Sequence, residues 1–254
     1  MLAGNMKSTR TDVPLHAIAS HSPIGHNIPH ARDGETIMAK DGRARFRDVI
    51  TSEEELRAIA GDIYPGAVTK VIDHLDEDSR AFIAHAPFLL IGSASPELGV
   101  EVSPKGDPAG FVKVLDEKTL AIPDRPGNAR MDTFRNVLRD PHVGMIFLVP
   151  GRKDTLRVSG RAQIVRDMDL RRSMAVDGKV PEMALVIDVD HAFFHCAKCV
   201  VRSGLWDKDK WPDTTGMRSL GAALIAAATK RRADAREAKA VDDELAQDEV
   251  DGLY

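Results

Sequence analysis

Hydrophobic positions along the chain change their period after Pro87. From Phe88 onward, short apolar runs are separated by Gly, Pro or Asp, which is typical of strands joined by tight turns. The stretch 155–165 alternates, with Leu156 and Val158 on one side and Arg157 on the other, and this predicts a strand with one buried face. Strands are expected at residues 88–91, 100–103, 111–115, 120–122, 143–149, 155–165 and 183–189.

The number and spacing of these runs favour one fold class. The links between the runs have hairpin length, and few helices cross over between them. Six or seven short strands of this kind favour an antiparallel barrel, mainly β with peripheral helices, over a doubly wound sheet. The unbroken apolar run 143–149 predicts a strand buried on both faces. Helices are expected near residues 52–61, 70–86, 130–138 and 167–174, the first opened by a Ser52–Glu55 capping box and the second broken around residues 76–78.

The two ends of the chain differ from this middle part. Residues 1–45 lack aromatic residues and hold four of the nine histidines, at intervals too loose for one metal-binding helix face. They predict a flexible N-terminal arm, with a metal site as the alternative. Residues 213–254 predict one C-terminal helix that packs over its first turns and then frays, either as a solvated extension or as a dimer contact. The expected domains are therefore the arm 1–45, a core domain 46–212 and a helical extension 213–254.

Composition excludes several classes of function. With 35 basic and 39 acidic residues the formal charge is −4, which gives no reason to expect nucleic acid as a partner. No apolar stretch approaches the ~18–20 residues of a membrane span, and the start of the chain lacks the pattern of a secretory signal. Two cysteines are too few for a disulfide scaffold. We therefore expect a cytoplasmic protein.

Charged residues beside a predicted turn suggest an anion site. Arg125 and Arg130 flank a Pro-Gly turn that opens a helix, so guanidinium groups and backbone N–H groups can converge on a phosphate there. Lys105, in the segment 102–108 between two predicted strands, adds a third positive charge. Arg157 either enters this site or faces solvent. An ordinary solvated loop is the alternative reading of the same residues.

A second cluster of chemically active residues spans His191 to Cys199. Cys196 and Cys199 form a Cys-x-x-Cys pair, and a zinc site would require four ligands. On a helix Cys196 would point away from the other candidates, and the βαβ context of a thioredoxin-like pair is absent. Structural or simply buried cysteines are therefore expected, with a redox pair or a metal site as alternatives. The adjacent rings of Phe193 and Phe194 are expected in the core or at a dimer interface.

Five segments in this order resemble the pyridoxamine 5′-phosphate oxidase-related FMN-binding proteins, which share the flavin-reductase-like split barrel. The closest resemblance is to a longer subgroup with the motifs V-S-P-[RK]-G-D-P-x-G-F and I-P-D-R-P-G-N-x-R, and it covers roughly residues 51–212. The matching segments are 102–111, 122–130, 147–162, 194–198 and 202–206.

The resemblance implies a homodimer of split barrels with an FMN at each of two sites across the subunit interface. One strand would follow the flavin ring and ribityl chain, a turn would hold the ribityl hydroxyls and phosphate, and a third segment would come from the other subunit. A C-terminal element would also reach the flavin. The strand residues carried over are Val102, Ser103, Pro104 and Lys105, and the turn residues are Asp124, Arg125, Asn128 and Arg130. The segment from the other subunit is Thr155, Leu156 and Arg157, and the C-terminal element supplies Arg202 and Trp206.

The implied activity is that of an FMN-dependent oxidoreductase transferring hydride through flavin N5, with NAD(P)H as a candidate donor. Lys105 or Arg157 would place a positive charge beside N1 and O2. His195 is a candidate proton donor, and a packed histidine is the alternative. The oxidases themselves end in Arg-Leu-His-Asp-Arg where this chain reads Arg202-Ser-Gly-Leu-Trp206, so pyridoxamine phosphate is not the expected substrate. Alternatives are an F420-dependent reductase and a non-catalytic flavin- or haem-binding protein.

Overall fold

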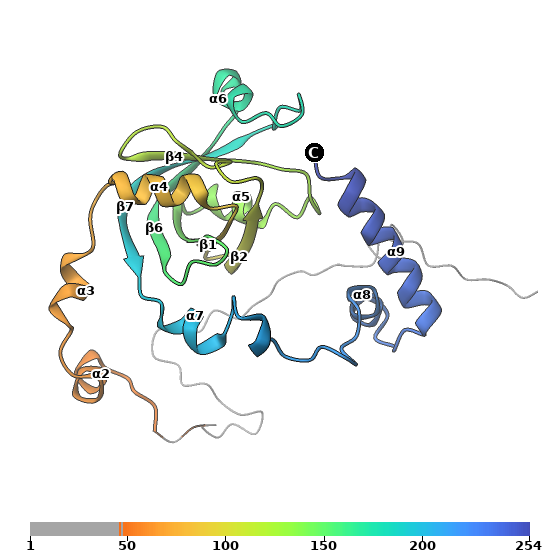
Figure 1. Cartoon of the computed structure of the whole chain (residues 1–254), viewed down its shortest axis with the longest axis horizontal. Coiled ribbons are helices and arrows are strands. Elements are labelled where there is room, and N and C mark those ends of the chain that lie inside the picture. Colours follow the sequence, from red (N-terminus) through yellow and green to blue (C-terminus); the bar gives the residue numbers. More distant parts are fainter. Residues whose placement is uncertain (1–45, 47) are drawn as a thin grey trace, which may run out of the picture. The chain divides into compact units, whose positions relative to one another are not determined.

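The computed structural model describes residue 46 and residues 48–254 (Figure 1). Contacts divide them into two units. The sheet unit contains the described residues up to 124 together with 130–210, and the C-terminal unit contains residues 125–129 and 211–254. The predicted N-terminal arm and its histidines lie outside the described residues.

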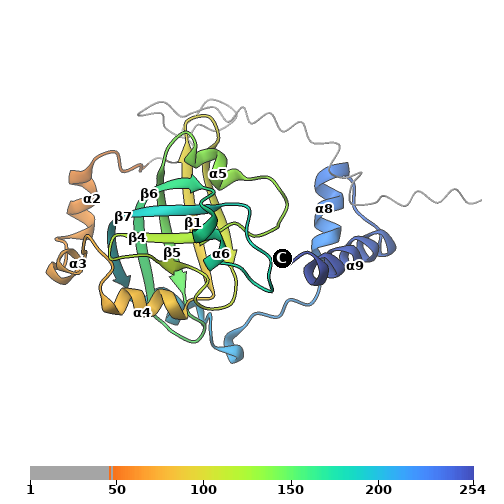
Figure 2. The same cartoon turned by 90° about the horizontal axis from the view of Figure 1, so that it is seen from above.

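A seven-stranded antiparallel sheet forms the sheet unit (Figure 2). Its strand order is β2-β1-β5-β6-β7-β4-β3, so hairpins and neighbouring links account for most of the pairing. The predicted class, mainly β with six to seven antiparallel strands and peripheral helices, is confirmed. The strands are β1 (Phe88–Ser95), β2 (Gly99–Gly106), β3 (Lys113–Val114), β4 (Thr119–Pro123), β5 (His142–Leu148), β6 (Thr155–Val165) and β7 (Ala184–His195).

One face of the sheet forms the core, and β6 has the burial pattern that its sequence predicts. Leu156 and Val158 are fully buried, and Arg157 between them is exposed. The prediction that residues 143–149 are buried on both faces is wrong. Burial alternates along β5, so Ile146 points outward and is 38% exposed. An antiparallel sheet can leave one face open, and an apolar residue on that face is indistinguishable from a core residue in the sequence.

The helix α4 (Glu77–His85) packs Phe82 and Ile83 into the core and contacts β3, β6 and β7. It begins at Asp76, whose carboxylate accepts a hydrogen bond from the Ser79 N–H at 2.8 Å. The helical stretch expected over residues 70–86 is therefore wrong before the expected break at 76–78, and the helix after that break is confirmed. Ile72 instead forms an isolated β-bridge with Ala192, with N–O distances of 3.0 and 2.8 Å, and this long-range pairing leaves no local signal.

The remaining helices of the sheet unit are short. Helix α2 lies between its Ser52 cap and Gly61 as predicted, although it buries none of its residues. The predicted helices near 130–138 and 167–174 are present with slightly shorter bounds. The helices are α2 (Glu53–Ala60), α3 (Pro65–Thr69), α5 (Asp132–Val137), α6 (Met168–Ser173), α7 (Lys198–Ser203) and the 3₁₀ turn η1 (Lys208–Lys210).

The C-terminal unit contains two helices, so the prediction of one fraying helix is wrong. Helix α8 (Leu220–Thr229) ends at Lys230, which adopts a left-handed conformation with φ of 56°. Helix α9 (Ala235–Asp251) restarts with a capping box between Asp234 and Glu237. The helices approach closely at Gly221, where an added Cβ would lie 2.7 Å from the Ala238 carbonyl oxygen. Across the part of the chain that is described, none of the helices is long and apolar enough to cross a membrane.

Candidate functional site

The predicted flavin-ring segment lies within strand β2 rather than between two strands. This strand is at the edge of the sheet, where Pro104 costs no ladder hydrogen bond. Its side chains alternate, so Ser103 and Lys105 lie on the core face, and Val102 and Pro104 lie on the opposite face, here called the outer face. A planar group on either face would therefore meet only half of these side chains.

Helix α5 covers the core face of β2. Thr133 Oγ1 donates a hydrogen bond to Ser103 Oγ at 3.0 Å, and the Lys105 ammonium lies 5.7 Å from the Phe134 ring centroid. Burial lowers the pKa of Lys105, and the nearby Asp124 carboxylate partly opposes this shift. Lys105 and Asp124, predicted from separate segments to contact one ligand, thus lie close enough to interact.

The turn at Arg130 is conformationally strained. The residues on either side, Ala129 and Met131, are both left-handed, with φ of 56° and 58°. Such conformations in residues other than glycine are uncommon and cluster at ligand sites. Arg130 Nε donates to Asp132 Oδ2 at 2.8 Å, and this bond raises the pKa of Arg130. A phosphate at this turn would share Arg130 with the first carboxylate of α5.

Arg125 and Asn128 belong to the C-terminal unit rather than the sheet unit. Within that unit the Arg125 guanidinium lies 5.5 Å from the ring centroid of Tyr254. This contact was missed by sequence reasoning, which placed the C-terminal end outside any packed region. A cation placed over the face of an aromatic ring is attracted to it electrostatically.

The outer face carries a cluster of rings and cations where β6 meets β7. Phe193 lies between two positive charges, with the Arg157 guanidinium 5.1 Å and the Lys70 ammonium 5.0 Å from its ring centroid. Lys70 also donates to the Phe194 carbonyl oxygen at 2.9 Å, and the His191 ring stacks 6.3 Å from Phe193. The predicted site residue Arg157 therefore faces this cluster. Lys70 was missed because nothing local in the sequence relates it to Phe193.

His195 is the last residue of β7 and follows Phe193 on the outer face. Its Nδ1 atom is buried and has no hydrogen-bond partner within the described residues. Its neighbour across the ladder, Thr155, is 8% exposed. Leu156 is fully buried in the core, so its side chain does not reach the outer face. The alternation of His191, Phe193 and His195 would have signalled a strand longer than the predicted 183–189.

The remaining predicted residues lie beyond β7. Trp206 donates from its indole Nε1 to the Arg152 carbonyl oxygen at 2.7 Å, so it fixes the loop between β5 and β6. Arg202 is exposed on α7. Cys196 and Cys199 are exposed free thiols, so the expectation that they are buried is wrong. Over the described range, His, Cys, Asp and Glu form no group of three that could hold a metal ion.

Comparisons with known proteins give one family match and several distant structural neighbours. The family model described as pyridoxamine 5′-phosphate oxidase matches residues 75–196, just under half of the chain. None of the curated proteins matches the chain.

Among solved structures, an assigned pyridoxamine 5′-phosphate oxidase from Lactobacillus delbrueckii is 19% identical over 48% of this chain and 99% of its own, with a TM-score of 0.36. An FMN-binding protein from Syntrophomonas wolfei is 15% identical over 48% of this chain and 86% of its own, with a TM-score of 0.38. HupZ from Group A Streptococcus is 15% identical over 47% of this chain and 92% of its own, with a TM-score of 0.38.

Proposed function

We propose that this chain is an FMN-dependent oxidoreductase that works as a homodimer and transfers hydride to or from a small molecule. The observation that carries the proposal is the match of residues 75–196 to the pyridoxamine 5′-phosphate oxidase model. The matched range contains three of the segments expected to contact FMN, namely residues 102–105, 124–130 and 155–157.

The chemistry of the turn residues fits a phosphate monoester. Such a group carries close to two negative charges and accepts hydrogen bonds from several donors at once. Arg125 and Arg130 supply guanidinium donors, and Asn128 supplies an amide. The two left-handed residues Ala129 and Met131 flank Arg130, and uncommon backbone conformations of this kind cluster at ligand sites. In this proposal Asp124 accepts hydrogen bonds from the ribityl hydroxyls.

The outer-face cluster fits the flavin ring. FMN, when bound, supplies hydride transfer at N5. Arg157, held over Phe193, places a positive charge at the edge of a flat aromatic surface. Lys105, the other candidate for a charge near N1 and O2, lies on the core face of β2 beside Phe134 and is left out of this role. Because the buried Nδ1 of His195 has no partner in the described chain, a ligand atom there would complete its hydrogen bonding. His195 is accordingly the proposed group that holds or delivers a proton.

An apolar outer face supports the homodimer. Val100 and Val102 on β2 are 77% and 61% exposed, and Phe88 and Ile146 on the neighbouring strands also point outward and are exposed. Contiguous apolar surface of this kind is typical of a protein interface. We propose that a second copy covers it, so that residues 155–157 of one copy approach the flavin held by β2 and the turn of the other.

Purification of the untagged full chain tests the proposal. We expect a yellow protein whose released cofactor is FMN, which is reduced by NADH or NADPH and reoxidised in air, and which sediments as a dimer. A Soret band would show that the chain binds haem and not FMN. A colourless protein that reduces added F420 would show that it is an F420-dependent reductase. A yellow protein that no donor reduces would indicate a carrier or sensor.

A further inference from the structure

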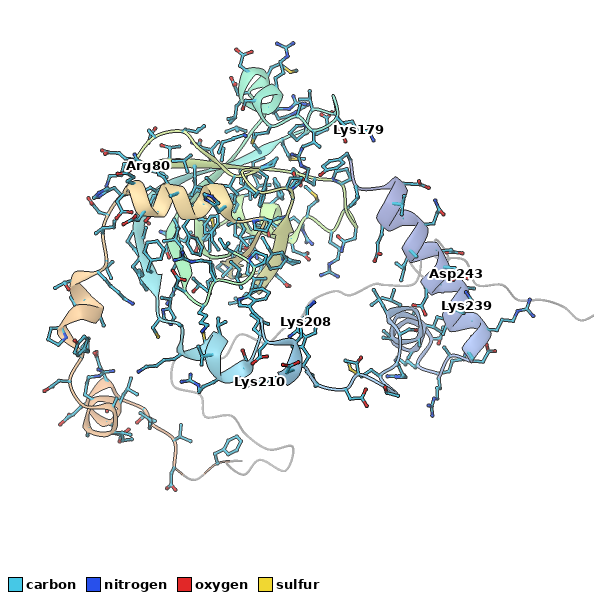
Figure 3. All side chains as sticks on the ribbon, in the orientation of Figure 1. Arg80, Lys179, Lys208, Lys210, Lys239 and Asp243 are labelled. Atoms are coloured by element: carbon cyan, nitrogen blue, oxygen red, sulfur yellow. The ribbon has the colours of Figure 1, made fainter. Side chains whose placement is uncertain are left out.

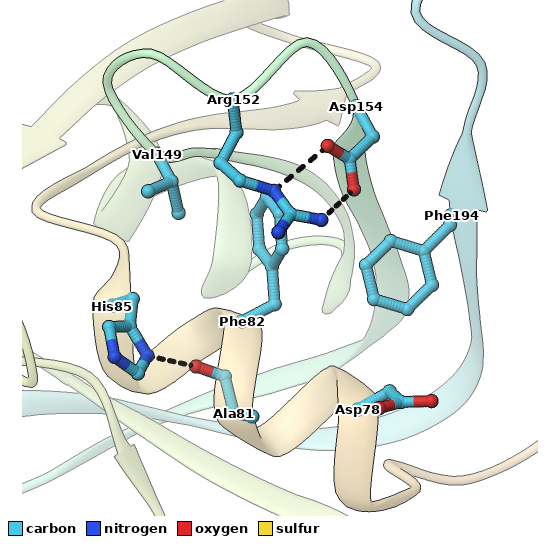
Figure 4. A pocket seen from close by; sticks show the side chains of 8 residues that line it. All are labelled: Asp78, Ala81, Phe82, His85, Val149, Arg152, Asp154 and Phe194. Atoms are coloured by element: carbon cyan, nitrogen blue, oxygen red, sulfur yellow. Dashed lines mark hydrogen bonds and ion pairs between the residues drawn. The ribbon is translucent and has the colours of Figure 1, made fainter.

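A cavity opens between α4 and the loop that joins β5 to β6 (Figure 4). Its volume is about 560 Å³, which lies in the range of small-molecule sites. It contains none of the residues assigned to FMN above. The lining residues are Asp78, Ala81, Phe82, His85, Val149, Arg152, Asp154 and Phe194.

Two aromatic rings form the apolar part of this cavity. Phe82 and Phe194 meet edge to face, with ring centroids 5.5 Å apart and an interplanar angle of 78°. Phe82 is held in the core and is only 7% exposed, so its ring has little freedom to rearrange, and Phe194 beside it is half-buried. Val149 adds an aliphatic side chain beside them (Figure 4). A flat ring is the ligand shape that such a wall accommodates best.

Arg152 supplies a hydrogen-bond donor that is fixed in position. Its Nε and Nη2 atoms donate to the two carboxylate oxygens of Asp154 at 3.0 and 2.7 Å. Its carbonyl oxygen accepts the Trp206 indole N–H, and its guanidinium lies 5.8 Å from the Phe82 ring centroid. The third nitrogen, Nη1, has no acceptor in the described part of the chain and retains two N–H donors beside the rings.

His85 supplies an acceptor at the mouth of the cavity. Its Nδ1 donates to the Ala81 carbonyl oxygen at 2.8 Å, so in the neutral ring the Nε2 atom carries the lone pair. The charge of Arg152 is already balanced by Asp154. The Asp78 carboxylate adds a negative charge but extends away from Arg152 (Figure 4). This balance disfavours an anionic ligand and leaves one donor and one acceptor for a neutral one.

We propose that this cavity binds an uncharged, planar heteroaromatic lactam. Its ring would lie against Phe82 and Phe194, its carbonyl oxygen would accept from Arg152 Nη1, and its ring N–H would donate to His85 Nε2. The site is separate from the proposed FMN site, so neither proposal depends on the other.

Three small probes test the proposed recognition in the full chain. 2-Quinolinone carries the lactam, N-methyl-2-quinolinone lacks its N–H, and quinoline-2-carboxylate carries a negative charge. Because the Trp206 indole N–H is bonded to Arg152, its NMR signal reports binding at this cavity. We expect 2-quinolinone to shift that signal and to bind roughly three- to ten-fold more tightly than either other probe, the effect of one net hydrogen bond.

Matched variants assign the contacts. Arg152→Ala should weaken the binding of 2-quinolinone by roughly three- to ten-fold. Arg80→Ala, an exposed arginine on the same helix as Phe82 that does not line the cavity, should have no effect (Figure 3). His85→Leu should weaken the binding of 2-quinolinone and leave the binding of N-methyl-2-quinolinone unchanged. A Trp206 signal that 2-quinolinone does not shift, equal binding by Arg152→Ala and Arg80→Ala, or displacement of the probe by FMN would each overturn the proposal.

Discussion

Arg157 and Phe193 face each other across the β6–β7 pair, with the guanidinium carbon 5.1 Å from the ring centroid. They are direct neighbours in the antiparallel register, and both side chains lie on the outer face. Arg157 is exposed, and its guanidinium lies against a ring. This distinguishes it from Arg161, which is exposed on the same strand and the same face but four residues further along.

The first prediction concerns this pair. Arg157→Ala should weaken FMN binding by about tenfold or more, because a hydrogen bond to a charged group contributes ~1.5–3 kcal/mol. Arg161→Ala is the matched control and should bind FMN as the unmodified chain does. Titration of FMN fluorescence measures both affinities. Equal affinity of the two variants for FMN would show that Arg157 does not contact the cofactor.

The second prediction concerns the turn. Replacing Arg125 and Arg130 with Ala should abolish FMN retention during purification, since each charge-assisted bond contributes ~1.5–3 kcal/mol. The control is Arg135→Ala with Arg139→Ala, two exposed arginines in and just after α5. The ratio of flavin to protein absorbance measures occupancy. A doubly substituted turn that purifies fully loaded would show that the phosphate is held elsewhere.

A third prediction separates the thiols from the cofactor. Both Cys196 and Cys199 are exposed, and neither belongs to a metal-binding group within the described residues. Changing both to Ser should leave the FMN content and the dimer intact. Loss of colour in this variant, measured against the unmodified protein prepared in parallel, would restore a redox or metal role for the pair.

The fourth prediction is a pH dependence in the C-terminal unit. The Arg231 guanidinium donates to both carboxylate oxygens of Glu237 at 2.5 and 2.7 Å, and this lowers the pKa of Glu237 from 4.5 to about 2. Because the folded state favours the charged carboxylate, its contribution to stability is present above pH 4.5 and is lost as the pH falls towards about 2.

Hydrogen exchange of α9 between these two pH values measures that loss. Glu237→Gln should weaken the pH dependence and leave the helix less protected at neutral pH. Asp242 on the same helix keeps the remainder, because hydrogen bonds from Ser219 and the Gly221 N–H also lower its pKa. Glu249→Gln, an exposed change near the other end of α9, is the control and should retain the full pH dependence of exchange. An unchanged acid response in Glu237→Gln would mean that another group governs the helix.

Local patterns predicted those elements whose stability is local. Ser52 and Gly61 bound α2 because capping groups lie within a turn of the residues they cap, and β6 follows from its own alternation. The bridge between Ile72 and Ala192 joins residues far apart in the sequence, so the helix expected there was wrong. The Asp234–Glu237 capping box was a local signal for α9 that the composition of the segment obscured.

The candidate site was predictable only in part for the same reason. Arg130 and Asp132 are close in the sequence, but the segment was interpreted as the start of a helix. The hydrogen bond by which the Asp132 carboxylate competes with a ligand for Arg130 was therefore not predicted. The position of Phe193 between Lys70 and Arg157 depends on three segments that meet only in the folded chain. Nothing in the sequence around Lys70 could indicate it.

A comparison of FMN with riboflavin tests the central claim most directly, because the two differ only in the phosphate. Calorimetric titration of the cofactor-free full chain should give an affinity for FMN at least tenfold higher than for riboflavin, the effect of one or more charge-assisted hydrogen bonds. The Arg125→Ala, Arg130→Ala variant should lose this difference. Equal affinity for the two flavins in the unmodified chain would contradict a phosphate site at the turn.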